Sequence, residues 1–206
     1  EFAGLSKAGL IGNIKIHPKN SNIIYVAVLG NIFGPNKERG VYKSTDGGKT
    51  WNKIHFISNK TGARDVEINP SNPREILASF WTVQRKPWTL VDGGNEGGIF
   101  LSKNEGKTWK KLKNGLPEGL IGKIEVEYSP ANSNRIWAMI TAKEEDEGGL
   151  YRSDNGGVSW KRINRDHKLR QRGWYYSHIT ADPKNENIIY ASNTGFYKSI
   201  DGGITF

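Results

Sequence analysis

The sequence predicts an all-β fold, a β-propeller of four-stranded antiparallel blades, and three observations support this expectation. A turn-forming motif occurs four times, at intervals of about fifty residues. Each copy is flanked by short segments rich in β-branched and aromatic residues, which favour strands. No long segment shows the 3.6-residue periodicity of an amphipathic helix. Four short strands repeated at this spacing are typical of propeller blades.

The composition fits a globular chain and excludes several classes of site. Among 206 residues, seven Trp, eight Tyr and seven Phe supply large side chains for a core. The absence of Cys excludes disulfides, Cys-ligated zinc and thiol nucleophiles. The four His have no metal-ligand spacing, and no cofactor fingerprint occurs, so we predict neither a metal nor a cofactor. No apolar run is long enough to span a membrane.

The net charge of +9 permits attraction to polyanions without specifying one. The most basic stretch, residues 161–172, is explained equally well by a solvated strand and loop. We therefore do not expect nucleic acid as a partner.

The repeated motif has the pattern S-x-[DN]-x-G-x-[ST]-[WF] and predicts a hairpin turn. An Asp or Asn side chain can accept backbone N–H bonds within a tight turn, and Gly supplies the positive φ that such a turn requires. We therefore assign a structural role to the acidic or amide residue of each copy. These residues are Asp46, Asn104, Asn155 and Asp201.

Each repeat also contains a second unit upstream of the turn, and together the two units define four strands, A to D. An alternating strand is followed by a Pro-Asn turn and a β-branched strand, as at residues 14–18 and 23–26. The chain is then expected to be an arc of about four blades from a ring of seven to ten. Its partners would be the remaining blades, and the alternative is a ring closed alone or by self-association. The predicted boundaries are 1–8 for strand D of a preceding blade, 9–56, 57–114 and 115–170 for three blades, and 171–206 for an incomplete blade.

The four turns resemble the Asp-boxes, or BNR repeats, of sialidases, xyloglucan-cleaving glycoside hydrolases and ten-bladed sortilin-type propellers. The phrases at 34–40, 81–88 and 172–178 are similar to bacterial sortilin-like BNR-repeat proteins that are often labelled glycosyl hydrolases. The resemblance covers nearly the whole chain. It implies an exported protein, extracellular or periplasmic, whose propeller binds a ligand or hydrolyses a glycoside.

The connectivity of the strands indicates which rim of the propeller carries a site. The motif turns and the Pro-Asn turns share one rim, whereas the B-to-C and D-to-A connections share the other. Loops on this second rim are longer and carry aromatic residues, as binding loops on a rigid scaffold do. Carbohydrate or peptide could bind there, although the same side chains could instead cap blade edges. The candidate ligand-binding residues are Trp81, Arg85, Trp88, Arg172, Trp174, Tyr175, Tyr176 and His178.

Polar residues also recur in strand A of every repeat, five residues before its proline. This column is Asn13, Asp65, Glu125 and His178, and a second layer holds Lys15, Glu67, Glu127 and Thr180. Opposite charges in one layer could pair between blades, or the column could form a functional rim.

Glycoside hydrolysis requires two carboxylates about 5 to 10 Å apart. No spacing in the sequence singles out a pair, and the candidates are Asp65, Glu125 and Glu38. Three functions therefore stay open at this point: a binding propeller, part of a glycoside hydrolase, or a structural segment without its own site.

Overall fold

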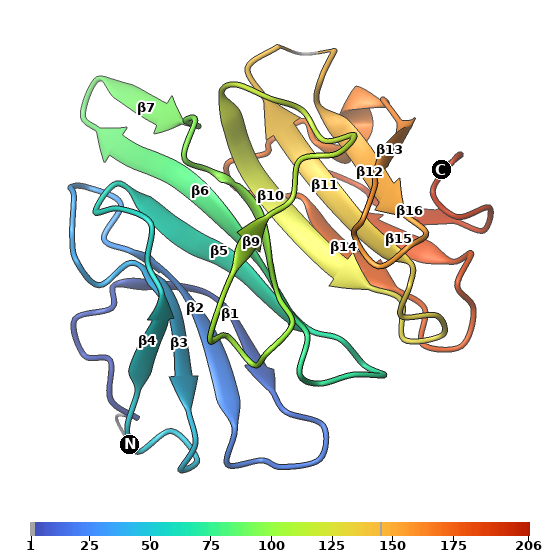
Figure 1. Ribbon diagram of the computed structural model, residues 1–206. Helices are drawn as coiled ribbons and strands as arrows, with labels where there is room; N and C mark the ends of the chain where they lie inside the picture. Colours follow the sequence, from blue (N-terminus) through green and yellow to red (C-terminus); the bar gives the residue numbers. More distant parts are fainter. Residues whose placement is uncertain (1–2, 145) are drawn as a thin grey trace.

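The structure of the chain, a computed structural model, describes residues 3–144 and 146–206. It contains three sheets with the strand orders β1-β2-β3-β4, β5-β6-β8-β9 and β10-β11-β12-β13, and a three-stranded sheet, β14-β15-β16. Figure 1 shows these sheets following one another in chain order as an arc of blades. The prediction of an all-β propeller with antiparallel blades is confirmed. The strands are β1 (Leu10–Ile16), β2 (Ile24–Gly30), β3 (Gly40–Ser44), β4 (Asn52–His55), β5 (Thr61–Ile68), β6 (Ile76–Lys86), β7 (Thr89–Asp92), β8 (Gly98–Ser102), β9 (Lys110–Lys111), β10 (Ile121–Tyr128), β11 (Ile136–Ala142), β12 (Gly149–Ser153), β13 (Lys161–Asn164), β14 (His178–Ala181), β15 (Ile189–Ser192) and β16 (Phe196–Ser199), with one 3-10 helix, η1 (His167–Leu169).

The repeated motif folds as a clasp between the third and fourth strands of a blade. In the first copy, the Ser44 hydroxyl donates to Asp46 Oδ1 at 2.7 Å and accepts from the Gly48 N–H at 2.8 Å. Asp46 Oδ1 also accepts from the Thr50 N–H at 2.9 Å. Gly48 has φ of +89°, a conformation that a residue with a Cβ avoids. The same three hydrogen bonds recur in the other three copies.

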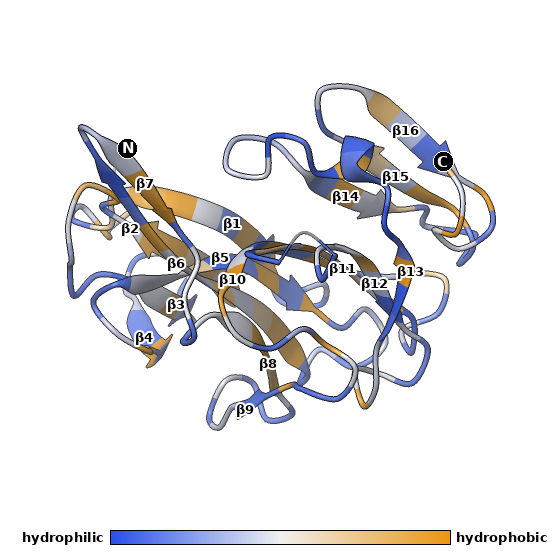
Figure 2. Cartoon of the chain, turned by 90° about the horizontal axis from the view of Figure 1, so that it is seen from above, coloured by the Kyte–Doolittle hydropathy of each residue, from blue (hydrophilic) through white to orange (hydrophobic). Residues whose placement is uncertain are grey.

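The hydrophobic core lies in the seams between successive blades. One buried cluster joins the first and second sheets, another joins the second and third, and a third joins the third and fourth. The aromatic residue that ends each clasp packs into the seam with the preceding blade, as Trp109, Trp160 and Phe206 do. Figure 2 shows hydrophobic residues along the packed strands and a hydrophilic surface on β13 and η1. Burial between blades therefore fixes the order of the sheets.

The second blade differs from the prediction in one respect. The long connections of the second rim were expected to be loops, but in this blade β6 continues to Lys86 and turns back as β7, Thr89–Asp92. The extension is compatible with a strand because it begins with the aromatic and β-branched residues Trp81, Thr82 and Val83, and Pro87 lies in the turn. The predicted loop is thus a hairpin that projects beyond the sheet (Figure 1).

The segment predicted as strand D of a preceding blade, residues 1–8, lies partly outside the described residues. In its described part, residues 3–8, the chain forms turns and no strand. These residues pack on the outer face of the first sheet, where the Trp51 indole N–H donates to the Ala3 carbonyl at 2.7 Å.

Candidate functional site

The two rims of the propeller have different chemistry. At one rim, the Gly47 N–H in the first clasp donates to the carbonyl of Asn22 in the neighbouring Pro-Asn turn, at 3.0 Å. The equivalent bond occurs in the other three blades, at 2.7–2.8 Å. The clasps and the Pro-Asn turns are therefore joined to each other. The predicted ligand loops begin at the opposite ends of the strands.

Two of these loops meet across the second rim and form an aromatic cluster. Trp81 of β6 contacts Trp174 edge to face, with 4.9 Å between the ring centroids and 72° between the ring planes. Arg85, further along β6, donates from Nη1 to the Tyr175 hydroxyl at 3.0 Å. These contacts connect the second blade to the loop that leads into the fourth blade, so they pass across the rim of the third blade. We call Phe33, Trp81, Arg85, Trp88, Trp174 and Tyr175 the aromatic rim.

The members of the aromatic rim differ in exposure. Trp81 is 3% exposed and its indole N–H donates to Asp92 at 2.8 Å, so its ring supports Trp174 from beneath. Trp88, at the tip of the β6–β7 hairpin, is 79% exposed. A shallow groove of about 520 Å³ lies beside it, with Arg85 and Phe33 in its lining. Phe33 and Trp88 therefore present apolar ring surface next to a guanidinium.

The loop before β14 carries the other sequence-predicted binding residues. Its backbone turns at Arg172, whose carbonyl accepts from the N–H groups of Tyr175 and Tyr176. The Tyr176 carbonyl in turn accepts from Lys123 Nζ of β10 at 2.5 Å. Arg172 is exposed, and Tyr175 and Tyr176 are about half exposed. His178 does not join this cluster, because it begins β14 and lies within 3.5 Å of Glu125.

The polar columns of the first strands come together in a groove of about 400 Å³ along β1, β5, β10 and β14, which we call the inner groove. Its side chains bridge successive blades. Between the first and second blades, Asn13 Nδ2 donates to Asp65 Oδ1 at 2.5 Å, and Lys15 pairs with Glu67 at 2.7 Å. Between the second and third, Arg64 pairs with Glu125. Between the third and fourth, the Ala181 N–H donates to Glu127 at 3.3 Å.

Burial changes the acidity of the carboxyl groups in the inner groove. Burial, reinforced by the charge of Glu125, raises the pKa of Asp65 to about 7. Burial also raises the pKa of Glu127 to about 7 and raises that of Glu67. The charge of Asp65 adds to the effect of burial at both Glu67 and Glu127. The groove therefore holds protons near neutral pH.

The hydrogen bonds of Asp65 indicate that it has a role in holding the blades. Its Oδ1 accepts from Asn13 and from the Val66 N–H at 2.9 Å, and its Oδ2 accepts from the Val126 N–H at 3.0 Å. Glu125 is paired with Arg64 and with Lys123 Nζ at 3.3 Å. The sequence suggested that opposite charges in these columns pair between blades. In the inner groove, Lys15 and Glu67 form such a pair.

Glu38, the third carboxylate candidate, lies away from the inner groove. It is in the connection before β3, where the Tyr42 hydroxyl donates to its carbonyl at 2.9 Å. Within residues 3–144 and 146–206, no group of three or more His, Asp or Glu side chains could hold a metal ion. The helix in the same ranges is too short to cross a membrane.

Sequence reasoning missed Arg64 and Lys123, which complete the inner groove. Strict alternation places Arg64 on the opposite face from Asp65, but the pairing of β5 with β6 shifts register between Ala63 and Asp65. A similar shift occurs between Ile121 and Ile124 in β10. A β-bulge places two residues opposite one and redirects their side chains.

Four antiparallel sheets, each with the same Ser and Asp or Asn clasp after its third strand, define an Asp-box β-propeller. The BNR/Asp-box repeat family model matches residues 42–53, which include the first clasp. A xyloglucanase of Paenibacillus sp is 27% identical over 179 residues, covering 82% of this chain and 16% of the relative. Sortilin of Rattus norvegicus is 29% identical over 137 residues, covering 65% of this chain and 14% of that protein.

Solved structures agree with the sequence relatives on the fold. The GH74 xyloglucanase from Xanthomonas campestris superposes with a TM-score of 0.67 at 16% identity, covering 94% of this chain and 28% of that one. The chain thus has an Asp-box (BNR-repeat) β-propeller fold and is similar in sequence to xyloglucanases and to sortilin, as the sequence resemblance indicated. It spans about a sixth to a quarter of the length of its xyloglucanase relatives.

Proposed function

We propose that the aromatic rim binds carbohydrate, and that the chain is the ligand-binding portion of a polysaccharide-directed propeller protein. The supporting observation is the pair of exposed rings, Phe33 and Trp88, on the groove that Arg85 also lines. The apolar faces of sugar rings pack on aromatic surfaces, and a guanidinium can donate several hydrogen bonds to hydroxyl oxygens. The Tyr175 hydroxyl holds Arg85 in place from the other side.

The comparisons favour a plant-type polysaccharide as the ligand class. Several relatives carry the name xyloglucanase, and those of Paenibacillus sp and Acetivibrio thermocellus match 82% and 94% of this chain. Xyloglucan is a branched glucan, and a long open rim suits an extended ligand better than an enclosed pocket does. A polysaccharide ligand also implies an extracellular or periplasmic location for this protein.

Calorimetric titration of the protein with xyloglucan oligosaccharides tests this proposal. Trp88→Ala should weaken binding by about 1 to 3 kcal/mol if the ring is an anchor. Val158→Ala is a matched control because this side chain is 67% exposed on the clasp rim. It should leave binding unchanged. Absence of oligosaccharide binding, or equal binding by Trp88→Ala and wild type, would refute the proposal. Binding of short peptides in place of oligosaccharides would also refute it and would indicate that the aromatic rim binds peptide.

A second candidate function is glycoside hydrolysis in the inner groove. One observation favours it, namely the raised pKa of Asp65. The neighbouring Glu125 forms salt bridges with Arg64 and Lys123. A carboxyl group that keeps its proton near neutral pH, with a second carboxyl group nearby, is the arrangement that a general acid and its partner require. Release of reducing ends from xyloglucan should then fall in both Asp65→Asn and Glu125→Gln while oligosaccharide binding persists. Unchanged turnover in either variant would exclude this function.

A further inference from the structure

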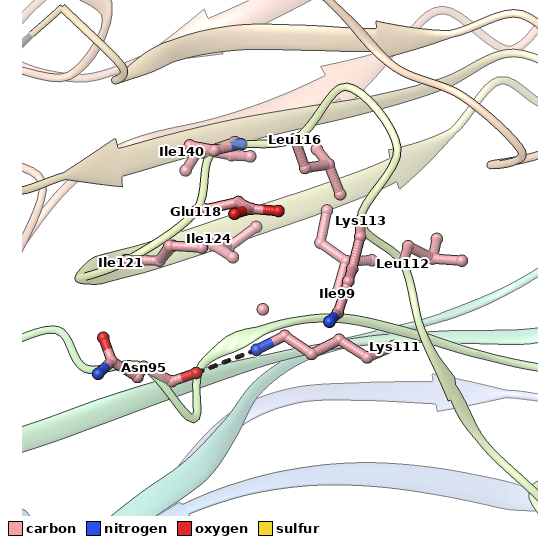
Figure 3. Close-up of a pocket in the computed structure, with 13 residues that line it drawn as sticks. Asn95, Ile99, Lys111, Leu112, Lys113, Leu116, Glu118, Ile121, Ile124 and Ile140 are labelled. Carbon is pink, nitrogen blue, oxygen red and sulfur yellow. Dashed lines mark hydrogen bonds between the residues drawn. The ribbon is translucent and has the colours of Figure 1, made fainter.

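A separate cavity of about 320 Å³ lies in the seam between the second and third blades. Figure 3 shows the side chains that line it, which come from β8, the 112–120 connection, β10 and β11. One part of its wall is aliphatic, and three of the residues there, Ile99, Ile124 and Ile140, are no more than 1% exposed. Another part is polar and includes Asn95 and Glu118. The cavity is at the small end of the range for ligand pockets, which is roughly 300 to 1,000 Å³.

The cavity exists because the connection over this seam does not fill it. In the next seam, the corresponding connection inserts Leu169 of η1, which is 1% exposed. In the preceding seam, Ile57 packs against the core cluster. The 112–120 connection instead contains Gly115, Pro117 and Gly119, and its Leu120 is 42% exposed. Leu112 and Leu116 line the cavity and leave its centre open.

The edge of the cavity is positively charged. Lys111 and Lys113 reach the same edge, and Glu118 lies across from Lys111 (Figure 3). Lys111 Nζ donates to the Asn95 carbonyl at 3.1 Å. Burial and the neighbouring charge of Lys113 lower the pKa of Lys111, so the two ammonium groups repel each other. An added anion at this edge would relieve that repulsion.

We infer that this cavity binds a medium-chain aliphatic carboxylate, with its chain between the isoleucine walls and its carboxylate at Lys111 and Lys113. Against the isoleucine side chains an alkyl chain is favoured over a sugar, because hydroxyl groups packed on them would lose hydrogen bonds to water. A chain of methylene groups makes no such demand, and its burial is favourable. The carboxylate accepts charge-assisted hydrogen bonds from the two ammonium groups. This site is independent of carbohydrate binding at the aromatic rim.

Titration of the ¹⁵N-labelled protein with octanoate, followed by NMR, tests the inference, with 1-octanol as the uncharged probe. Addition of octanoate should shift the backbone amide signals of residues 111–124, and these shifts should reach saturation. Octanoate should bind about tenfold more tightly than octanol. The double variant Lys111→Met, Lys113→Met should lose about tenfold in octanoate affinity, whereas Lys110→Met, an exposed neighbour on the same strand, should lose none. Leu116→Trp, which narrows the cavity, should abolish binding of both probes.

The charge variants keep the test decisive even if Leu116→Trp does not fold. No saturable octanoate binding by the wild type overturns the inference. Equal affinities for octanoate and octanol, or equal losses in the Lys110 and Lys111 variants, also overturn it.

Discussion

The buried carboxyl group of Asp65 should make the stability of the protein depend on pH. Its pKa is about 7 in the folded chain because of burial and the charge of Glu125, whereas an unfolded Asp titrates near 3.9. The folded state therefore binds more protons than the unfolded state between these values. The free energy of unfolding should fall as pH rises from about 4 to about 7, by up to about 1.4 kcal/mol per pH unit for this group.

Other groups in the groove titrate in the same range, so the variant Asp65→Asn is needed to isolate the effect. The raised pKa of Glu127 adds a contribution of the same sign. His178 has the opposite sign, because burial lowers its pKa and stability rises as pH increases toward its unfolded value. Asp65→Asn also loses the bond from the Val126 N–H, which shifts stability by a constant amount.

Urea unfolding of wild type and Asp65→Asn at pH 5.5, 6.5 and 7.5 measures the difference. The wild type should lose more stability than the variant over this interval, and the gap between their slopes should be close to one proton at the lowest pH and shrink as pH passes the pKa of Asp65. Parallel pH profiles for the two proteins would refute the assignment of a raised pKa to Asp65.

Three further stability predictions follow from particular contacts, and urea unfolding checks each of them. Arg39 is fully buried and donates to the carbonyls of Lys60, Asn31 and Val83, so Arg39→Met should cost about 3 to 5 kcal/mol; a loss below 1 kcal/mol would contradict this. Trp160→Ala should lower the free energy of unfolding by about 3 to 5 kcal/mol, because its ring fills the seam with the preceding blade. A change no larger than that of a substitution at an exposed residue would contradict the packing of this ring in the seam. Asp46→Ala should lower the urea midpoint because the turn loses the bonds from Thr50, and an unchanged midpoint would contradict a stabilising role for the clasp.

The sequence was sufficient for the parts of the fold that depend on local chemistry. The clasp at Asp46 was predictable because its hydrogen bonds lie within five residues of each other and its glycines mark the turn. The rim that carries Trp88 and Trp174 was predictable from strand connectivity alone. These features depend on short-range geometry, which residue types and spacing record directly.

Features that depend on contacts between blades were less accessible. Arg39 appeared in the sequence as one basic residue in a loop, yet it is buried against carbonyls of two other segments. Phe33 was not distinguished from other loop residues until the β6–β7 hairpin placed Trp88 on the same groove. The cavity beside Lys111 is a difference in packing volume, which no local pattern encodes.

The position of a bound oligosaccharide on the propeller would test most directly whether ligand chemistry lies opposite the clasps. NMR titration of the labelled protein with a xyloglucan oligosaccharide should shift backbone amides at residues 31–34, 84–90 and 172–176. Amides of the four clasps, such as those of Gly48 and Thr108, should remain unshifted. Shifts concentrated at the clasps, with the aromatic rim unaffected, would contradict this placement of the site.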